Sequence, residues 1–197
     1  MATVDRPSTH REELNILIDS ASKRFAAIAV VLFLGAPIVT YLSGDPRGLF
    51  YVHVALGAFW FGLDFFFKFV LGPSLDAAGD EAAAAVNAQV IPKMVVIAEP
   101  LSVGVIGSGI ALADLMGYWA DPSLWLWAAL GIGTLMLLIG FGPLHLLTTR
   151  MSVELSMPDP DGNRLDELFG KTVQWGMVQT ILMLAIILTM TALRWGL

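Results

Sequence analysis

Five apolar runs constrain this sequence more than any other feature. They lie at about 25–42, 49–71, 92–115, 124–147 and 172–195. At about 1.5 Å of rise per residue, a helix of 18 to 20 residues crosses the roughly 30 Å hydrocarbon core of a bilayer. Backbone amides find no water in that core, so a spanning segment must be helical. The pattern predicts an all-α integral membrane protein, built as a bundle of five transmembrane helices in the cell membrane.

Composition agrees with a chain that lies almost wholly in lipid. The sequence is 56% hydrophobic and 14% charged, whereas a soluble domain carries roughly 25% charged residues. A net charge of −6 argues against nucleic acid as a partner. The absence of cysteine excludes disulfides, thiolate metal sites and thiol catalysis. The sequence has no nucleophile–base motif, phosphate loop, zinc signature or dinucleotide fingerprint, so it favours no enzyme class.

The basic residues predict an orientation, with the N-terminus in the cytoplasm and the C-terminus outside, because Lys and Arg concentrate on the cytoplasmic side of membrane proteins. Residues 1–24 mix apolar and charged side chains and are expected to form a cytoplasmic amphipathic leader, followed by a single membrane domain over 25–197. The basic residues assigned to the inside are Arg6, Arg11, Lys23, Arg24, Lys93, Arg150, Arg164 and Lys171, and those assigned to the outside are Arg47 and Arg194.

The second run carries its ionisable residues on one stripe. At 100° per residue, His53, Asp64 and Lys68 fall within about 60° of one another on a helix. Ionised side chains are costly in hydrocarbon, so they face protein, a cavity or a partner. We therefore expect this stripe to face neighbouring helices.

Depth along the helices predicts a polar cluster in the cytoplasmic half of the bundle. Asp64, Lys68, Glu99 and Gln179 lie at similar depths by helix rise and could meet as an ion or proton relay. Asp64 and Lys68 are also spaced i, i+4, so they could instead form an ion pair that only locks the helix to its neighbours. Glu99 precedes Pro100, which frees a backbone carbonyl one turn earlier, and a protonated Glu99 bonded to a carbonyl is the alternative there.

Two histidines raise the possibility of heme b or copper. By helix rise, His53 and His145 lie roughly 25 Å apart along the membrane normal, with His53 toward the outside and His145 toward the cytoplasm. One heme cannot join them, so a heme would have a single His ligand or a His/Met pair. Beside His53, Met116 and Met190 are the candidate second ligands, and the same three residues suit Cu(I), which prefers soft ligands. Apolar packing for the methionines and interfacial hydrogen bonding for the histidines are the alternatives.

Two segments carry a family resemblance. They are YVHVALGAFWFGLDFFFKFVLGPSL at 51–75 and IGSGIALA at 106–113. Together they resemble the membrane domain of the copper-resistance D (CopD) family and of a related family of unknown function. The resemblance implies a small helical bundle that binds copper or heme, with His53 as the residue that carries over.

Three functions therefore remain open from the sequence. The first is heme or copper binding through His53, in electron transfer or metal handling. The second is a small transporter or channel-like protein that uses the relay cluster. The third is a non-catalytic subunit or assembly factor of a membrane complex, in which the polar residues only lock helices together. A short chain with five spans is also compatible with a homo-oligomer.

Overall fold

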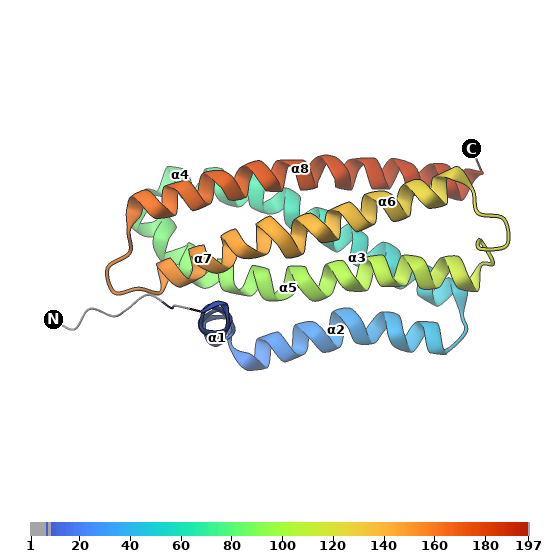
Figure 1. Ribbon diagram of the computed structural model, residues 1–197, viewed down its shortest axis with the longest axis horizontal. Helices are drawn as coiled ribbons and strands as arrows, with labels where there is room; N and C mark the ends of the chain where they lie inside the picture. Colours follow the sequence, from blue (N-terminus) through green and yellow to red (C-terminus); the bar gives the residue numbers. More distant parts are fainter. Residues whose placement is uncertain (1–6, 8, 197) are drawn as a thin grey trace.

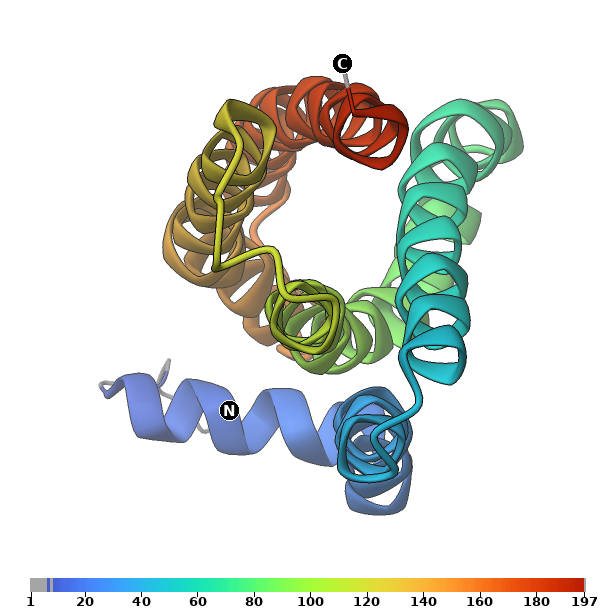
Figure 2. The same cartoon turned by 90° about the vertical axis from the view of Figure 1, so that its right-hand side faces the viewer.

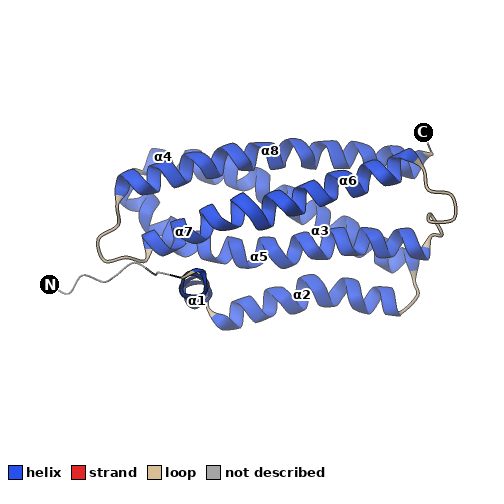
Figure 3. Ribbon diagram, viewed as in Figure 1, coloured by secondary structure: helices blue, strands red, loops and turns tan. Residues whose placement is uncertain are grey.

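The computed structural model describes Pro7 and residues 9–196, and all regular structure in these residues is helical (Figure 3). Within the described ranges, five helical segments are long and apolar enough to cross a membrane. The predicted fold class is confirmed at this level. The five segments are Lys23–Leu42, Pro46–Ala78, Asp80–Leu115, Leu124–Leu155 and Gly162–Trp195.

The first helix, α1 (His10–Ala21), begins with a capping box. The Thr9 hydroxyl accepts a hydrogen bond from the Glu12 backbone N–H, and the Glu12 carboxylate accepts one from the Thr9 N–H. In Figures 1 and 2, α1 lies across one end of the bundle, where it contacts α5 and α7. Residues 10–21 of the expected leader are therefore helical, whereas residues 1–6 and 8 lie outside the described residues.

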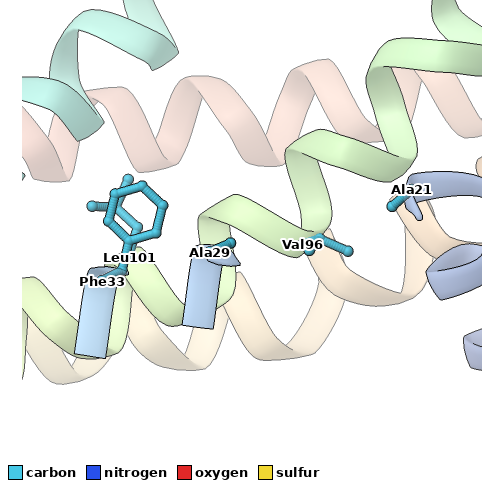
Figure 4. Packing of buried hydrophobic residues seen from close by; sticks show 5 residues of the cluster. All are labelled: Ala21, Ala29, Phe33, Val96 and Leu101. Atoms are coloured by element: carbon cyan, nitrogen blue, oxygen red, sulfur yellow. The ribbon is translucent and has the colours of Figure 1, made fainter. Parts of the chain in front are cut away.

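Helix α2 (Lys23–Leu42) packs along α5 (Asp80–Leu115), which contacts most other helices and is the centre of the fold. The backbones approach closely at Gly104, where an added Cβ would lie 2.1 Å from the Phe33 carbonyl oxygen. Small residues allow such close packing of membrane helices. A cluster of buried apolar side chains joins α1, α2 and α5 (Figure 4); its members are Ala21, Ala29, Phe33, Val96 and Leu101.

Helix α3 (Pro46–Phe66) crosses the bundle diagonally. It begins beside α2 and α5, where Asp45 caps it by accepting from the N–H groups of Arg47 and Gly48, and it approaches α8 (Gly162–Trp195) only toward its far end (Figure 2). A π-helical turn, η1 (Phe67–Leu71), then leads into α4 (Gly72–Ala78), and the segment ends at Gly79 with φ +91°.

The fourth segment is interrupted. Helix α6 (Leu124–Ile139) passes through a π-helical turn, η2 (Gly140–Leu144), into α7 (His145–Leu155), and Gly142 within that turn has the non-helical angles φ −94° and ψ −105°. Pro143 cannot supply a backbone N–H, which accounts for the break. Helices α6 and α7 both pack on α8.

Viewed along the bundle in Figure 2, α3, α5, α6 and α8 form a ring, and α2 lies outside it against α3 and α5. The end of the bundle that carries α1 is called the α1 end below, and the end that carries the C-terminus of α8 is called the Trp195 end (Figure 1). This arrangement places the stripe of α3 toward α5 and α8.

Candidate functional site

A cavity of about 570 Å³ lies inside the ring, in the half of the bundle nearer the Trp195 end. Its walls come from α3, α5, α6 and α8, and they are mostly apolar or aromatic. Pockets of roughly 300–1,000 Å³ with apolar walls and few polar groups are typical of small-molecule and cofactor sites. The cavity is therefore the first place to look for function.

His53 is the titratable group on the α3 side of this cavity. Its Nδ1 lies 3.0 Å from the Val105 carbonyl oxygen and 3.0 Å from Ser108 Oγ, and Ser108 itself donates to the same carbonyl. A carbonyl can only accept, so a neutral His53 carries its proton on Nδ1 and keeps a free lone pair on Nε2. In the part of the chain that the structure describes, Nε2 has no hydrogen-bond partner.

Gly109 makes room for the His53 ring. A Cβ on Gly109 would lie 3.0 Å from His53 Cε1, closer than nearly all real Cβ contacts. The ring is thus fixed on one side by the Val105 carbonyl and on another by a glycine of α5. A hydrogen bond of this kind fixes the tautomer and the orientation of an imidazole ring.

Four methionines line the same cavity. Met116 and Met190, which the sequence indicated as neighbours of His53, are both among the lining residues. Met136 and Met183 also line it, and they are 2% and 3% exposed. Met116 and Met190 could be identified from the sequence because they lie near the same helix ends as His53. Met136 and Met183 were missed because the cavity extends beyond His53 toward the middle of the bundle. The nitrogen and sulfur ligands that the lining offers are one imidazole and four soft thioethers, beside the hydroxyls of Tyr118 and Thr191.

Clusters of harder metal ligands are not found. Among the described residues, no three His, Asp or Glu side chains are grouped so that they could hold a metal ion.

A second polar site joins α3 to α8 and comprises Asp64, Lys68 and Thr180. Asp64 and Lys68 form an ion pair with side chains only 16% and 18% exposed. The Thr180 hydroxyl lies 2.7 Å from Lys68 Nζ and 2.7 Å from Asp64 Oδ2, so it accepts from the ammonium and can donate to the carboxylate. Gly176, one turn earlier on α8, leaves room for the lysine, because a Cβ there would lie 3.1 Å from Lys68 Cε.

A third polar site lies at the α1 end. Glu99 pairs with His145 Nδ1, so α5 is tied to the start of α7. The His145 ring packs edge-on against His10 of α1, with centroids 5.4 Å apart, and His10 Nδ1 lies 3.3 Å from Glu13 Oε2. Glu99, predicted to lie beside a broken helix, thus has a histidine partner, and α5 continues through Pro100 without a break.

The structure does not bring the four expected relay residues together. Asp64 and Lys68 meet Thr180, Glu99 meets His145, and Gln179 places Nε2 3.5 Å from the Met136 carbonyl oxygen. Equal depth was a poor guide to contact, because only Asp64 and Lys68 share a neighbour, while Glu99 and Gln179 each face another helix. Gln179 is 4% exposed, and its Oε1 has no hydrogen-bond partner within the described residues.

His53 and His145 belong to different sites. His53 lines the cavity, whereas His145 lies at the α1 end, where its Nδ1 is paired with Glu99. This arrangement is in line with the expectation that no single heme joins both residues.

Comparison of the chain with protein-family models, curated proteins and solved structures gave no match. What the fold and the site define is an all-helical bundle with five helices able to span a membrane in its described part, enclosing an apolar cavity with one oriented histidine.

Proposed function

We propose that the protein is an integral membrane protein that binds one heme b through His53 and takes part in electron transfer. The observation that carries this proposal is the His53 imidazole. Its Nδ1 is committed to the Val105 carbonyl, its Nε2 is free, and the ring borders an apolar cavity of about 570 Å³.

The lining of the cavity fits such a group. A porphyrin needs flat apolar and aromatic walls, which Phe50, Trp60 and Phe61 supply on α3. A thioether from α5, α6 or α8 would supply the second ligand, and His/Met ligation is a known arrangement that raises the reduction potential of heme iron. The chemistry that a bound heme supplies is one-electron transfer, while the residues of this chain hold it and keep water away.

Copper is the alternative occupant of the same site. Cu(I) would take His53 with thioethers such as those of Met116 and Met190, in metal handling rather than electron transfer. A single ion leaves most of the cavity empty, so the volume favours heme. The resemblance to the CopD family is compatible with either ligand.

The outer surface supports placement of the bundle in the cell membrane. Large apolar side chains such as Val31, Leu138 and Leu188 are 71%, 65% and 71% exposed. Soluble monomers rarely expose contiguous apolar surface on this scale. With the orientation indicated by the basic residues, the α1 end faces the cytoplasm and the His53 cavity lies in the outer half of the membrane.

A relay is the second candidate function, and the pairing of charges across helices favours it. The Asp64–Lys68–Thr180 site joins α3 to α8, and Glu99 with His145 joins α5 to α7. Ionisable residues inside membrane helices often mark ion or proton paths. In this proposal the two sites exchange protons or bind an ion, and the cavity serves another purpose.

The absorbance spectrum of the protein purified in detergent tests the heme proposal. Cells grown with ample heme and copper should yield a protein with a Soret band, and His53→Ala should lower that band several-fold because the iron loses its fixed ligand. His145→Ala is the matched control, since this histidine lies at the α1 end, and its preparation should keep the band.

A colourless wild-type preparation from such cells would refute heme binding. Metal analysis of the same preparation then separates the two alternatives, because bound copper that His53→Ala removes would support the copper site. A metal-free and colourless protein would leave the relay as the better proposal.

A further inference from the structure

The part of the cavity nearest the Trp195 end carries a positive charge. Among the described residues that line the cavity, Arg194 is the only one with a full charge, and it lies at the Trp195 end beside Thr191 and Trp195. The rest of the lining is apolar or aromatic apart from His53, Thr191 and Tyr118. A cation at the rim of an apolar pocket selects for a ligand with an anionic end.

Arg194 has no acidic partner among the described residues. Within the described ranges it makes no ion pair, although acidic residues lie at the same end of the bundle. Asp114 accepts a hydrogen bond from the Tyr41 hydroxyl at 2.9 Å, and Asp45 caps the first turn of α3. Asp114 is thus hydrogen-bonded to α2 and Asp45 to the start of α3. The five N–H donors of the Arg194 guanidinium are available to a ligand.

The spacing of the two polar groups sets the length of that ligand. His53 is the eighth residue of α3, so it lies about 10 Å below the start of that helix at 1.5 Å per residue. Arg194 is the penultimate residue of α8, and both helix ends lie at the same end of the bundle (Figure 1). Along the bundle axis, a ligand bound at both residues therefore extends about 10 Å from His53 toward the Trp195 end, with an apolar body and an anionic group.

We propose that Arg194 binds a carboxylate of the cavity ligand, and that this ligand is a porphyrin with carboxylate side chains. The proposal rests on the proposed function, because the porphyrin would be the heme held by His53. Arginine matches a carboxylate with two parallel hydrogen bonds, and such charged bonds are stronger than neutral ones. The guanidinium thereby orients the ligand, with its acidic edge at the Trp195 end.

Iron-free porphyrins test this role separately from iron ligation. Protoporphyrin IX and its dimethyl ester have the same ring, but only the first carries carboxylates. Their affinities for the purified protein in a non-ionic detergent can be measured by porphyrin fluorescence. The wild type should bind the diacid about tenfold or more tightly than the diester. Arg194→Gln should reduce that preference to about twofold or less.

Two variants complete the experiment. Arg47→Gln removes the other basic residue assigned to this end, which does not line the cavity, and it should keep the wild-type preference. His53→Ala should also keep it, since an iron-free ring needs no axial ligand. Arg194→Lys should retain part of the preference, because the charge remains and the paired hydrogen bonds do not.

The outcomes separate the two proposals. An unchanged preference in Arg194→Gln, no preference in the wild type, or no binding of either porphyrin would overturn the role of Arg194. Loss of the preference in Arg194→Gln alone would support it even if the absorbance experiment showed no heme. A Soret band that depends on His53, without any carboxylate preference, would uphold the heme site and refute the anionic edge.

Discussion

Thr180 places one hydroxyl between two opposite charges. It accepts from Lys68 Nζ and lies equally close to Asp64 Oδ2, with the Gly176 carbonyl 3.0 Å away as another acceptor. Asp64 and Lys68 lie on the α3 segment, and Thr180 lies on α8. The Thr180 hydroxyl therefore provides hydrogen bonds to the ion pair and also joins two helices that otherwise make few contacts. A buried ion pair without such a partner is costly.

Replacement of Thr180 by valine should therefore destabilise the bundle. Valine keeps the shape and removes the hydroxyl, so Lys68 and Asp64 each lose a hydrogen bond. We expect the free energy of unfolding in detergent to fall by about 1–2 kcal/mol. Thr180→Ser retains the hydroxyl and is the control. Equal melting temperatures for Thr180→Val and the wild type would show that the hydroxyl contributes nothing.

The sequence identified some residues of the polar sites but not their partners on other helices. His53, Asp64 and Lys68 could be identified because charge in an apolar run is conspicuous and helical phase places them on one face. The partner of Glu99 could not, because His145 lies on another helix and no periodicity connects the two. Thr180 carries no charge, so nothing in the sequence separates it from an ordinary threonine of an apolar helix.

At the scale of elements, the packing of α2 on α5 depends on one glycine. The Phe33 carbonyl oxygen occupies the space where a side chain at Gly104 would begin. Gly107, three residues later on the same helix, is exposed and has nothing within 4 Å of an added Cβ. The two glycines therefore differ in packing but not in helical context.

Alanine at these positions should give opposite results. Gly104→Ala forces α2 away from α5 and should lower the free energy of unfolding by about 1–3 kcal/mol. Gly107→Ala should be neutral or stabilising by up to about 1 kcal/mol, since alanine is the better helix former. Thermal unfolding of both variants in the same detergent measures the difference. Similar melting temperatures would argue against close contact at Gly104.

The existence of the long helices followed from the sequence because lipid leaves an apolar run no other structure. The π-helical turns within these helices did not follow from the sequence. Pro92 and Pro100 lie within α5 without ending it, whereas Pro143, next to Gly142, coincides with a π-helical turn. A proline inside an apolar helix thus does not by itself predict a break, and the irregular turn occurs where Pro143 follows Gly142.

The molecule as a whole has two chemically different ends. The α1 end carries the amphipathic helix and the Glu99–His145 pair, and the half of the bundle nearer the Trp195 end carries the cavity. Only the arrangement in space revealed the cavity, because its lining residues come from four helices spread over most of the chain. The sequence left open whether His53 faces protein, a cavity or a partner, and the structure places it at the cavity.

The absence of cysteine makes the orientation easy to measure, since one introduced thiol is the only thiol. Asp121 and Asp159 are exposed and lie in connections at opposite ends of the bundle. In intact cells, Asp121→Cys should react with a membrane-impermeant maleimide, and Asp159→Cys should react only after permeabilisation. The reverse pattern would invert the proposed topology, and labelling of both in intact cells would refute a membrane-spanning bundle.

The diagonal course of α3 has a consequence for how far the cavity extends along the bundle. The cavity lining ends at Phe61 on α3 and Met183 on α8, three residues short of Asp64 and of Thr180, where the two helices are fastened together. The cavity lining therefore stops short of the Asp64–Lys68–Thr180 site. The cavity beside His53 and the ion pair of Asp64 with Lys68 are thus separate regions along the same long segment of the bundle.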